Sequence, residues 1–343
     1  MPNPDFRIHP RLLPRLGRNW RAPIAALAAL ALSACASLDA MRRVEINFDY
    51  VADLAANLAQ KPYRPQDPLP EQLRDLDYDA YRKIQYNNNN YLWKEEGLPF
   101  ALGFFHPGFL YADRVKVHEF TPTHEQHIRY LSTFFEFEDK ELEESLPSSL
   151  DYAGIRLSSS VGTEGDYREV ASFLGASYFR ATGYNLNYGA SARGIAIDSG
   201  LGKQEEFPKF VELWLGKPLG NAKSIVMYAL LDGPSVTGAY EFVIRPGEST
   251  VTEVRSRIFV REASESFGIA PLTSMFWRGE NRKSPETDYR PEVHDSDGLL
   301  IAERDEDPLW RVLDLGERTR LSYFGVDQLS GFGLLQRDRS FDN

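Results

Sequence analysis

Apolar residues in this chain recur in two patterns, first one at helical spacing and then a long series at strand spacing. Residues 47–60 place apolar side chains on one face of a helix, and Asn47 or Asp49 can cap its start. Four prolines between residues 62 and 70 then break regular structure and predict an extended connection. Residues 73–84 are predicted to hold a second short helix.

From residue 98 onward the chain follows the pattern of short strands bounded by Gly, Pro, Asp or Asn. Many short strands separated by turns, without regular βαβ alternation or an internal repeat, predict an all-β fold, a β-sandwich or a barrel. The acidic run 138–150 is predicted to be a solvated loop or a short helix. We expect strands at residues 115–120, 171–181, 194–197, 224–231, 239–244, 250–261, 299–302, 309–313 and 321–324.

Composition supports a folded chain and narrows its partners. The chain has 343 residues, of which 42% are hydrophobic and 26% charged, as in globular proteins. Its net charge is −11, and five arginines lie within residues 7–21, so the remainder is more acidic still. Such a body would repel nucleic acid and anionic lipid, whereas a neutral ligand meets no such penalty. The single cysteine excludes a disulfide within the chain and a cysteine-based zinc site.

The N-terminal 35 residues have the features of an export signal. The five arginines precede an uncharged run at 22–32, which is too short to span a bilayer, and small residues at 33–36. Two cleavage hypotheses stay open. Residues 32–35 resemble a lipobox that would leave Cys35 lipidated, and residues 34–36 fit an ordinary A-x-A site. The only cysteine stands at the lipobox position, which favours lipidation.

This organisation divides the chain into three predicted segments. They are a signal peptide at 1–35, a helix with a proline-rich lead-in at 36–70, and a β-sandwich at 71–343.

The most chemically suggestive segment is 288–298, which contains four acidic residues, an arginine and a histidine. Pro291 and Gly298 keep it out of regular helix or central strand. In an extended chain Asp295 and Asp297 point to the same side, and two close carboxylates raise the pKa of one of them. A carboxyl group kept protonated in this way can act as a general acid in glycoside hydrolysis. A polar turn and part of a calcium loop remain the alternatives.

Other candidate chemistries are weaker. The chain has no glycine-rich phosphate motif and no G-x-S-x-G motif, and Ser177 is predicted to be a packed hydroxyl. His118, His124 and His127 match no common zinc spacing, so we expect solvent-facing histidines and no metal. Trp277 with its neighbouring arginine suits sugar recognition, with core burial of Trp277 and its preceding phenylalanine as the alternative.

Eight separated strings, in the same order, closely resemble the periplasmic glucan biosynthesis proteins G and D, the MdoG/OpgG family. The resemblance runs from about residue 44 to the C-terminus. The strings are LPFALGFFHPGFLY (98–111), FLGASYFRA (173–181), YGASARGIAID (188–198), EEFPKF (205–210), YALLDGPSVTGAYEFVI (228–244), GIAPLTSMFW (268–277), YRPEVHDSDGLL (289–300) and GFGLLQRDRSFDN (331–343).

The resemblance implies an exported Gram-negative protein needed to make osmoregulated periplasmic glucans, whose backbone is β-1,2-linked glucose. It implies a large galactose-mutarotase-like sandwich with an acidic cleft, similar to inverting β-1,2-glucan hydrolases, and no cofactor. The general acid falls at Asp295, with Glu292 as a supporting carboxylate. The base acts through a relay and stays unplaced between Asp198 and Asp232. Candidate substrate-binding residues are Tyr178, Arg180, Tyr188, Arg193, Trp277, Arg278, Tyr289, Arg290, His294 and Asp297.

Two functional hypotheses follow from the resemblance. The first is an endo-hydrolase of β-1,2-glucan. The second is a non-catalytic factor that binds glucan and passes it to other periplasmic glucan synthesis proteins at the membrane. Family members continue into an immunoglobulin-like C-terminal domain, which we expect this sequence to lack. That expectation makes the chain a truncated product or a fragment and slightly favours an inactive remnant.

Overall fold

A computed structural model describes residues 45–162, 165–186, 189–280, 289–318 and 320–337. The predictions for residues 1–44, Cys35 among them, and for Tyr188 lie outside the described residues. Residues 45–343 form one compact unit. Within the described part of the chain, no helix has the length and apolar character that crossing a membrane requires.

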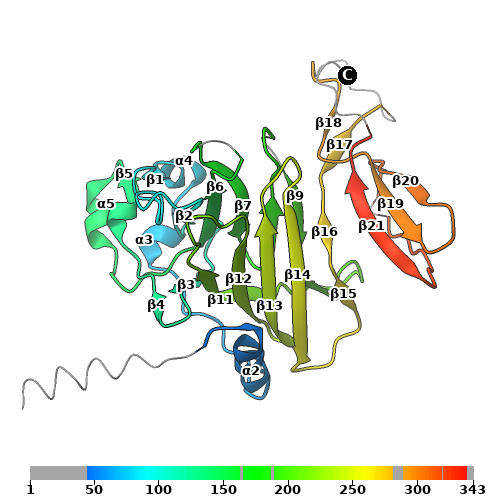
Figure 1. Ribbon diagram of the computed structural model, residues 1–343. Helices are drawn as coiled ribbons and strands as arrows, with labels where there is room; N and C mark the ends of the chain where they lie inside the picture. The colour runs from blue at the N-terminus through cyan, green and yellow to red at the C-terminus, as the bar shows by residue number, and fades with distance from the viewer. Residues whose placement is uncertain (1–44, 163–164, 187–188, 281–288, 319, 338–343) are drawn as a thin grey trace, which may run out of the picture. The chain divides into compact units, whose positions relative to one another are not determined.

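Two six-stranded sheets make up most of this unit (Figure 1). In both sheets neighbouring strands are antiparallel, except that β11 pairs with β3 in parallel. The first sheet has the order β14 (Val251–Val260), β13 (Val236–Arg245), β12 (Ile225–Asp232), β11 (Lys209–Gly216), β3 (Lys116–Phe120) and β4 (Glu125–His127). The second has the order β16 (Leu272–Thr273), β9 (Ala190–Arg193), β8 (Tyr178–Ala181), β7 (Arg168–Leu174), β6 (Gly154–Ser159) and β2 (Phe100–Phe105).

The core lies between these two sheets. Phe173 and Phe179 from the second sheet meet Phe242 from the first, with ring centroids 5.0 and 5.1 Å apart. Alternate residues of each strand point inward, which is why the hydrophobic alternation of the sequence is visible at all. The predicted all-β sandwich is confirmed.

Helix α2 (Phe48–Ala59) covers the other face of the first sheet (Figure 1). Its start is capped by Asn47, whose side chain accepts a hydrogen bond from the backbone N–H of Tyr50, as the sequence predicts. The ring of Tyr50 packs edge-on against Trp214 of β11, and the Thr237 hydroxyl of β13 donates to the carbonyl of Ala55.

The remaining elements are short. The helical ones are α3 (Glu71–Arg74), α4 (Tyr78–Tyr81), η1 (Ser132–Phe134) and α5 (Lys140–Ser145). Two-stranded pairings join β1 (Ile84–Tyr86) to β5 (Phe135–Phe137), β10 (Ile195–Ile197) to β15 (Phe267–Ile269), and β17 (Phe276–Arg278) to β18 (Val293–His294). A three-stranded sheet has the order β20 (Leu309–Val312), β19 (Gly298–Glu303) and β21 (Leu329–Leu335).

Several predicted elements need correction. The single strand predicted at 171–181 is two strands, because Gly175 and Ala176 adopt φ values of 78° and 45° and turn the chain between β7 and β8. The strand predicted at 321–324 does not form. The second predicted helix is two short ones, α3 and α4. Strands β6, β11 and β21 had no counterpart among the predicted strands.

Candidate functional site

Asp295 follows β18 on the short hairpin that β18 forms with β17. Its backbone N–H donates to the carbonyl of Met275 over 2.7 Å. In return the Met275 N–H donates to the Asp295 carboxylate over 3.1 Å. The side chain of Asp295 is exposed. The two main-chain bonds therefore fix an accessible carboxyl group in one position.

Glu292, His294 and Asp297, on the segment that contains Asp295, lie together. The Nε2 atom of His294 is 2.6 Å from a Glu292 carboxylate oxygen and 3.5 Å from one of Asp297. The imidazole is 8% exposed and stacks on the ring of Phe276, with centroids 5.6 Å apart. Asp297 also accepts a hydrogen bond from the backbone N–H of Arg337 over 2.7 Å. One atom from each of the three side chains lies within 4.8 Å of the others, close enough for a cation, yet the same spacing makes the hydrogen-bonded chain seen here.

The aromatic and basic candidates near this chain differ in exposure. Trp277 is 55% exposed and Tyr289 is 94% exposed, so both rings are available to a ligand. Arg278 is buried, and Arg290 is exposed. Phe276 is half-buried and packs against His294, whereas the ring of Trp277 is exposed.

Asp198 has a strained backbone conformation, and both of its carboxylate oxygens have partners. It follows β10 with a φ of 55°, a value that few non-glycine residues adopt. One carboxylate oxygen accepts hydrogen bonds from the backbone N–H groups of Glu265 and Ser266, both over 2.9 Å, and the other pairs with Lys203 over 3.0 Å. The hydrogen bond from Lys203 lowers the pKa of Asp198 below its usual range, which favours a charged carboxylate.

Asp232, the other candidate base, has a different environment. It ends β12 and pairs with Arg261 over 2.9 Å, where the two side chains are 12% and 4% exposed. Arg261 also donates to the backbone carbonyls of Leu58 and Lys61, at the end of α2. Burial raises the pKa of Asp232, and the bond from Arg261 opposes that rise. The Asp232 carboxylate therefore helps to hold α2 on the sheet, through Arg261.

Strands β8 and β9 bring together three of the other candidates. Tyr178 lies opposite Arg193, and Arg180 lies opposite Ser191, so all four side chains share the sheet face that points away from the core. The Arg193 guanidinium lies 5.8 Å from the centroid of the Tyr178 ring and pairs with Glu205 over 2.5 Å. Arg180 donates to the Ser191 hydroxyl over 3.2 Å.

These groups meet only in part. Among the described residues, no hydrogen bond or ion pair joins Asp198 or Asp232 to the chain Glu292–His294–Asp297. Asp198 and Asp295 are instead anchored to the two ends of one segment, residues 265–275. The pairing of β15 with β10 and of β16 with β9 fixes that segment to the sandwich.

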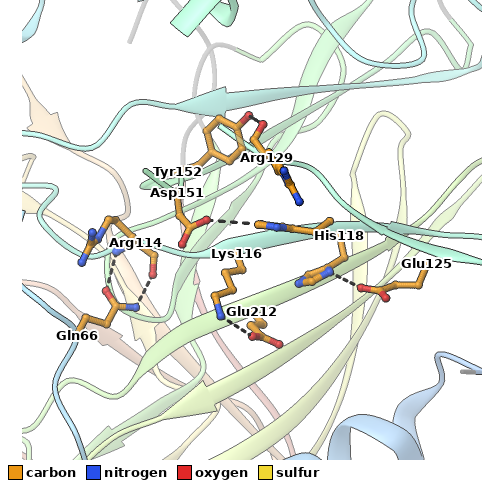
Figure 2. A network of polar contacts seen from close by, with 10 residues as sticks. Gln66, Arg114, Lys116, His118, Glu125, Arg129, Asp151, Tyr152 and Glu212 are labelled. Atoms are coloured by element: carbon orange, nitrogen blue, oxygen red, sulfur yellow. Dashed lines mark hydrogen bonds and ion pairs between the residues drawn. The ribbon is translucent and has the colours of Figure 1, made fainter. Parts of the chain in front are cut away.

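A second polar cluster was not recognised from the sequence. Figure 2 shows His118 beside Glu125. The Nε2 atom of His127 lies 3.5 Å from the Asp151 carboxylate. The prediction of solvent-facing histidines is wrong for His118, whose ring stacks on Trp214 of the parallel neighbour β11. Burial lowers the pKa of His118 to about 4. The only sequence signal was the H-x5-H-x2-H spacing, which gave no hint of Trp214 or Asp151.

Comparison with known proteins places this arrangement in a family. Residues 46–343 match the family model described as "Periplasmic glucan biosynthesis protein, MdoG". The chain belongs to this family. The chain is also similar to two curated relatives named "Glucans biosynthesis protein G". One, from Ralstonia nicotianae, is 43% identical over 315 residues, which are 92% of this chain and 62% of the relative. The other, from Rhodopseudomonas palustris, is 44% identical over 305 residues, which are 88% and 60% of the two chains.

Membership of the MdoG family confirms the resemblance seen in the eight sequence strings. The chain spans about 60% of the length of the curated relatives it matches. The family description concerns periplasmic glucan biosynthesis and assigns no residue, so the roles of the side chains above rest on their geometry.

Proposed function

We propose that this chain acts on periplasmic glucan by inverting endo-hydrolysis of its β-1,2-linked glucose backbone. The observation that carries the proposal is the exposed carboxyl of Asp295, which accepts a hydrogen bond from the backbone N–H of Met275 and is held in position by it. Glycoside hydrolysis needs a carboxyl group that is held at the leaving oxygen and is reachable by substrate.

In this proposal Asp295 protonates the glycosidic oxygen, and Glu292 is a supporting carboxylate three residues before it in the chain. The His294 imidazole holds Glu292 in place through the 2.6 Å contact, and Asp297 lies 3.5 Å from the same imidazole nitrogen. Trp277 and Tyr289 offer exposed rings to the apolar faces of glucose units.

Asp198 suits the role of base better than Asp232. A base must be ionised at working pH, and the Lys203 hydrogen bond holds the pKa of Asp198 low. Asp232 is committed to Arg261 and the end of α2. Because Asp198 and Asp295 are anchored at opposite ends of residues 265–275, proton transfer from the attacking water would run through a relay of water and sugar hydroxyl.

The acidic character of the chain fits this substrate. A net charge of −11 does not repel a neutral glucan, and it stabilises the positive charge that develops on the sugar ring in the transition state. The proposed location is the periplasm, as in the family description, with anchoring through Cys35 part of the same proposal.

The test measures new reducing ends and product size after incubation of the chain with linear β-1,2-glucan. Asp295→Asn should lower cleavage by about two to four orders of magnitude, because it removes the proton donor but keeps the acceptor for Met275. Asp305→Asn is the matched control, since Asp305 is an exposed aspartate on the β19–β20 turn. Equal cleavage by Asp295→Asn and the parent chain would remove Asp295 from the mechanism.

A second candidate function is a non-catalytic factor that binds glucan and delivers it to other periplasmic glucan synthesis proteins. The family description favours it in one respect, since it names biosynthesis and no hydrolysis. Binding of β-1,2-glucan by the parent chain and by Asp295→Asn, with no new reducing ends from either, would support this function over the first.

A further inference from the structure

A groove of about 770 Å³ opens at the edge of the sandwich, where strands β3 and β4 meet the segment that precedes β2. Its volume lies in the range of small-molecule binding sites. Its lining includes Trp93, Glu119, Lys217 and Leu131, none of which belongs to the hairpin of Asp295 or to the surroundings of Asp198. The groove is therefore separate from the site proposed above.

One wall of the groove is rigid. Trp93 adopts a φ of 70°, which costs a bulky residue conformational energy, and its ring is almost fully buried. Its indole N–H donates to the carboxylate of Glu119 on β3. This bond fixes one oxygen of Glu119 and leaves the other to a ligand.

Side chains of both charges line the groove. Lys217 pairs with Glu96 over 2.8 Å, and Glu125 lies against His118, a ring that burial keeps neutral near pH 7. Arg129 adds an exposed guanidinium to the lining. The three carboxylates and two cationic side chains of the lining offer both acceptors and donors to hydroxyl groups, and the excess of carboxylates disfavours an anionic ligand.

Apolar side chains complete the lining. Leu131 is 50% exposed, and Leu92, Ile128 and Phe134 contribute further apolar surface. Sugars present both features at once, since their ring C–H faces pack on apolar side chains while their hydroxyls bind charged groups.

We propose that this groove binds a neutral oligosaccharide at a second position, apart from the site of Asp295. The choice of a glucose oligomer as the ligand rests on the proposed function, but the groove itself does not. A long glucan bound at both positions would stay on the chain when its segment at the Asp295 site dissociates.

The test is calorimetric titration of linear β-1,2-linked glucopentaose into the chain carrying Asp295→Asn, which prevents cleavage. Leu131→Asp introduces a charge into the apolar wall, and Lys217→Gln removes a donor. Each should weaken one class of binding site by about tenfold or more, which corresponds to the loss of one good contact. Leu110→Asp and Lys223→Gln are matched exposed controls outside the groove lining.

The outcomes separate this proposal from the proposed function. Two classes of site, of which the groove variants remove one and Trp277→Ala weakens the other, would support both. A single class that the groove variants abolish supports the groove alone, because the sugar then does not bind near Asp295. Binding that the groove variants leave unchanged, or the absence of any binding, overturns the groove proposal, and cleavage measured with the parent chain still decides the proposed function.

Discussion

His106 offers the sharpest test of the energetics of this fold, because it is a buried titratable group with no charged partner among the described residues. The side chain is 3% exposed. Its Nδ1 atom lies 2.6 Å from the carbonyl of Pro107, and its Nε2 atom lies 2.9 Å from the Tyr130 hydroxyl. A carbonyl can only accept, so Nδ1 carries a proton. Burial disfavours the charged imidazole, so near pH 7 the ring is neutral and Nε2 accepts from the Tyr130 hydroxyl.

Burial lowers the pKa of His106 from 6.5 to about 4. Between these two values the unfolded chain binds a proton that the native chain does not bind, so the free energy of unfolding falls as the pH falls. The stabilisation is complete above pH 6.5 and is lost progressively down to about pH 4. A difference of this size corresponds to a loss of about 3 kcal/mol.

The assay is urea unfolding of the parent chain and of His106→Gln at several values from about pH 7 down to about pH 4. Glutamine does not titrate, so His106→Gln should lose about 3 kcal/mol less than the parent chain over this interval. Near neutral pH the variant should be less stable by about 1–3 kcal/mol, because its hydrogen bonds are imperfect. His124→Gln, in the turn between β3 and β4, controls for the exchange itself. An equal loss in the parent chain and His106→Gln would refute the argument.

Two further predictions concern the two candidate bases. Arg261→Met should lower the free energy of unfolding, measured by urea denaturation, by about 3–5 kcal/mol, because it leaves Asp232 buried and unpaired. The control is Arg257→Met, which removes an exposed ion pair with Asp49 and should change the free energy of unfolding by less than about 1 kcal/mol. Lys203→Met should raise the pKa of Asp198 and move the acid limb of the cleavage pH profile to higher pH, and an unmoved limb would argue against Asp198 as the base.

The fold class could be predicted from the sequence because it depends on local alternation and turn residues. Helix α2 was predicted for the same reason, since its cap and its apolar face lie within a few residues of each other. The division of residues 171–181 into two strands could not be predicted in this way. Both strands are apolar, and only the backbone conformation at Gly175 and Ala176 separates them. Residues 321–324 have strand composition but pair with no strand among the residues that the structure describes.

The same distinction between local and distant partners governs the candidate site. The sequence predicted Asp297 on the side of Asp295 and His294 on the other, which is wrong, because the structure brings His294 to both Glu292 and Asp297 within six residues of one segment. Asp198 and Asp232 had equal standing in the sequence, since each is an acid at the end of a strand. Their difference comes from partners that arrive from other elements: Arg261, which also binds the end of α2, and the N–H groups of residues 265–266.

Whether Asp198 or Asp232 is free to exchange protons with a substrate therefore depends on what else its cationic partner binds. Arg261 bonds to Asp232 and to α2 at once, so moving Asp232 toward a substrate would release the helix as well. Within the described part of the chain Lys203 pairs with Asp198 and the exposed Glu265 alone, so its ammonium group can follow a change in either without disturbing a sheet. A charged group that must exchange protons with a substrate needs this second kind of partner. The contrast makes Asp198 the carboxylate to test first as base, and makes Arg261→Met a variant whose effect should appear in stability before it appears in cleavage.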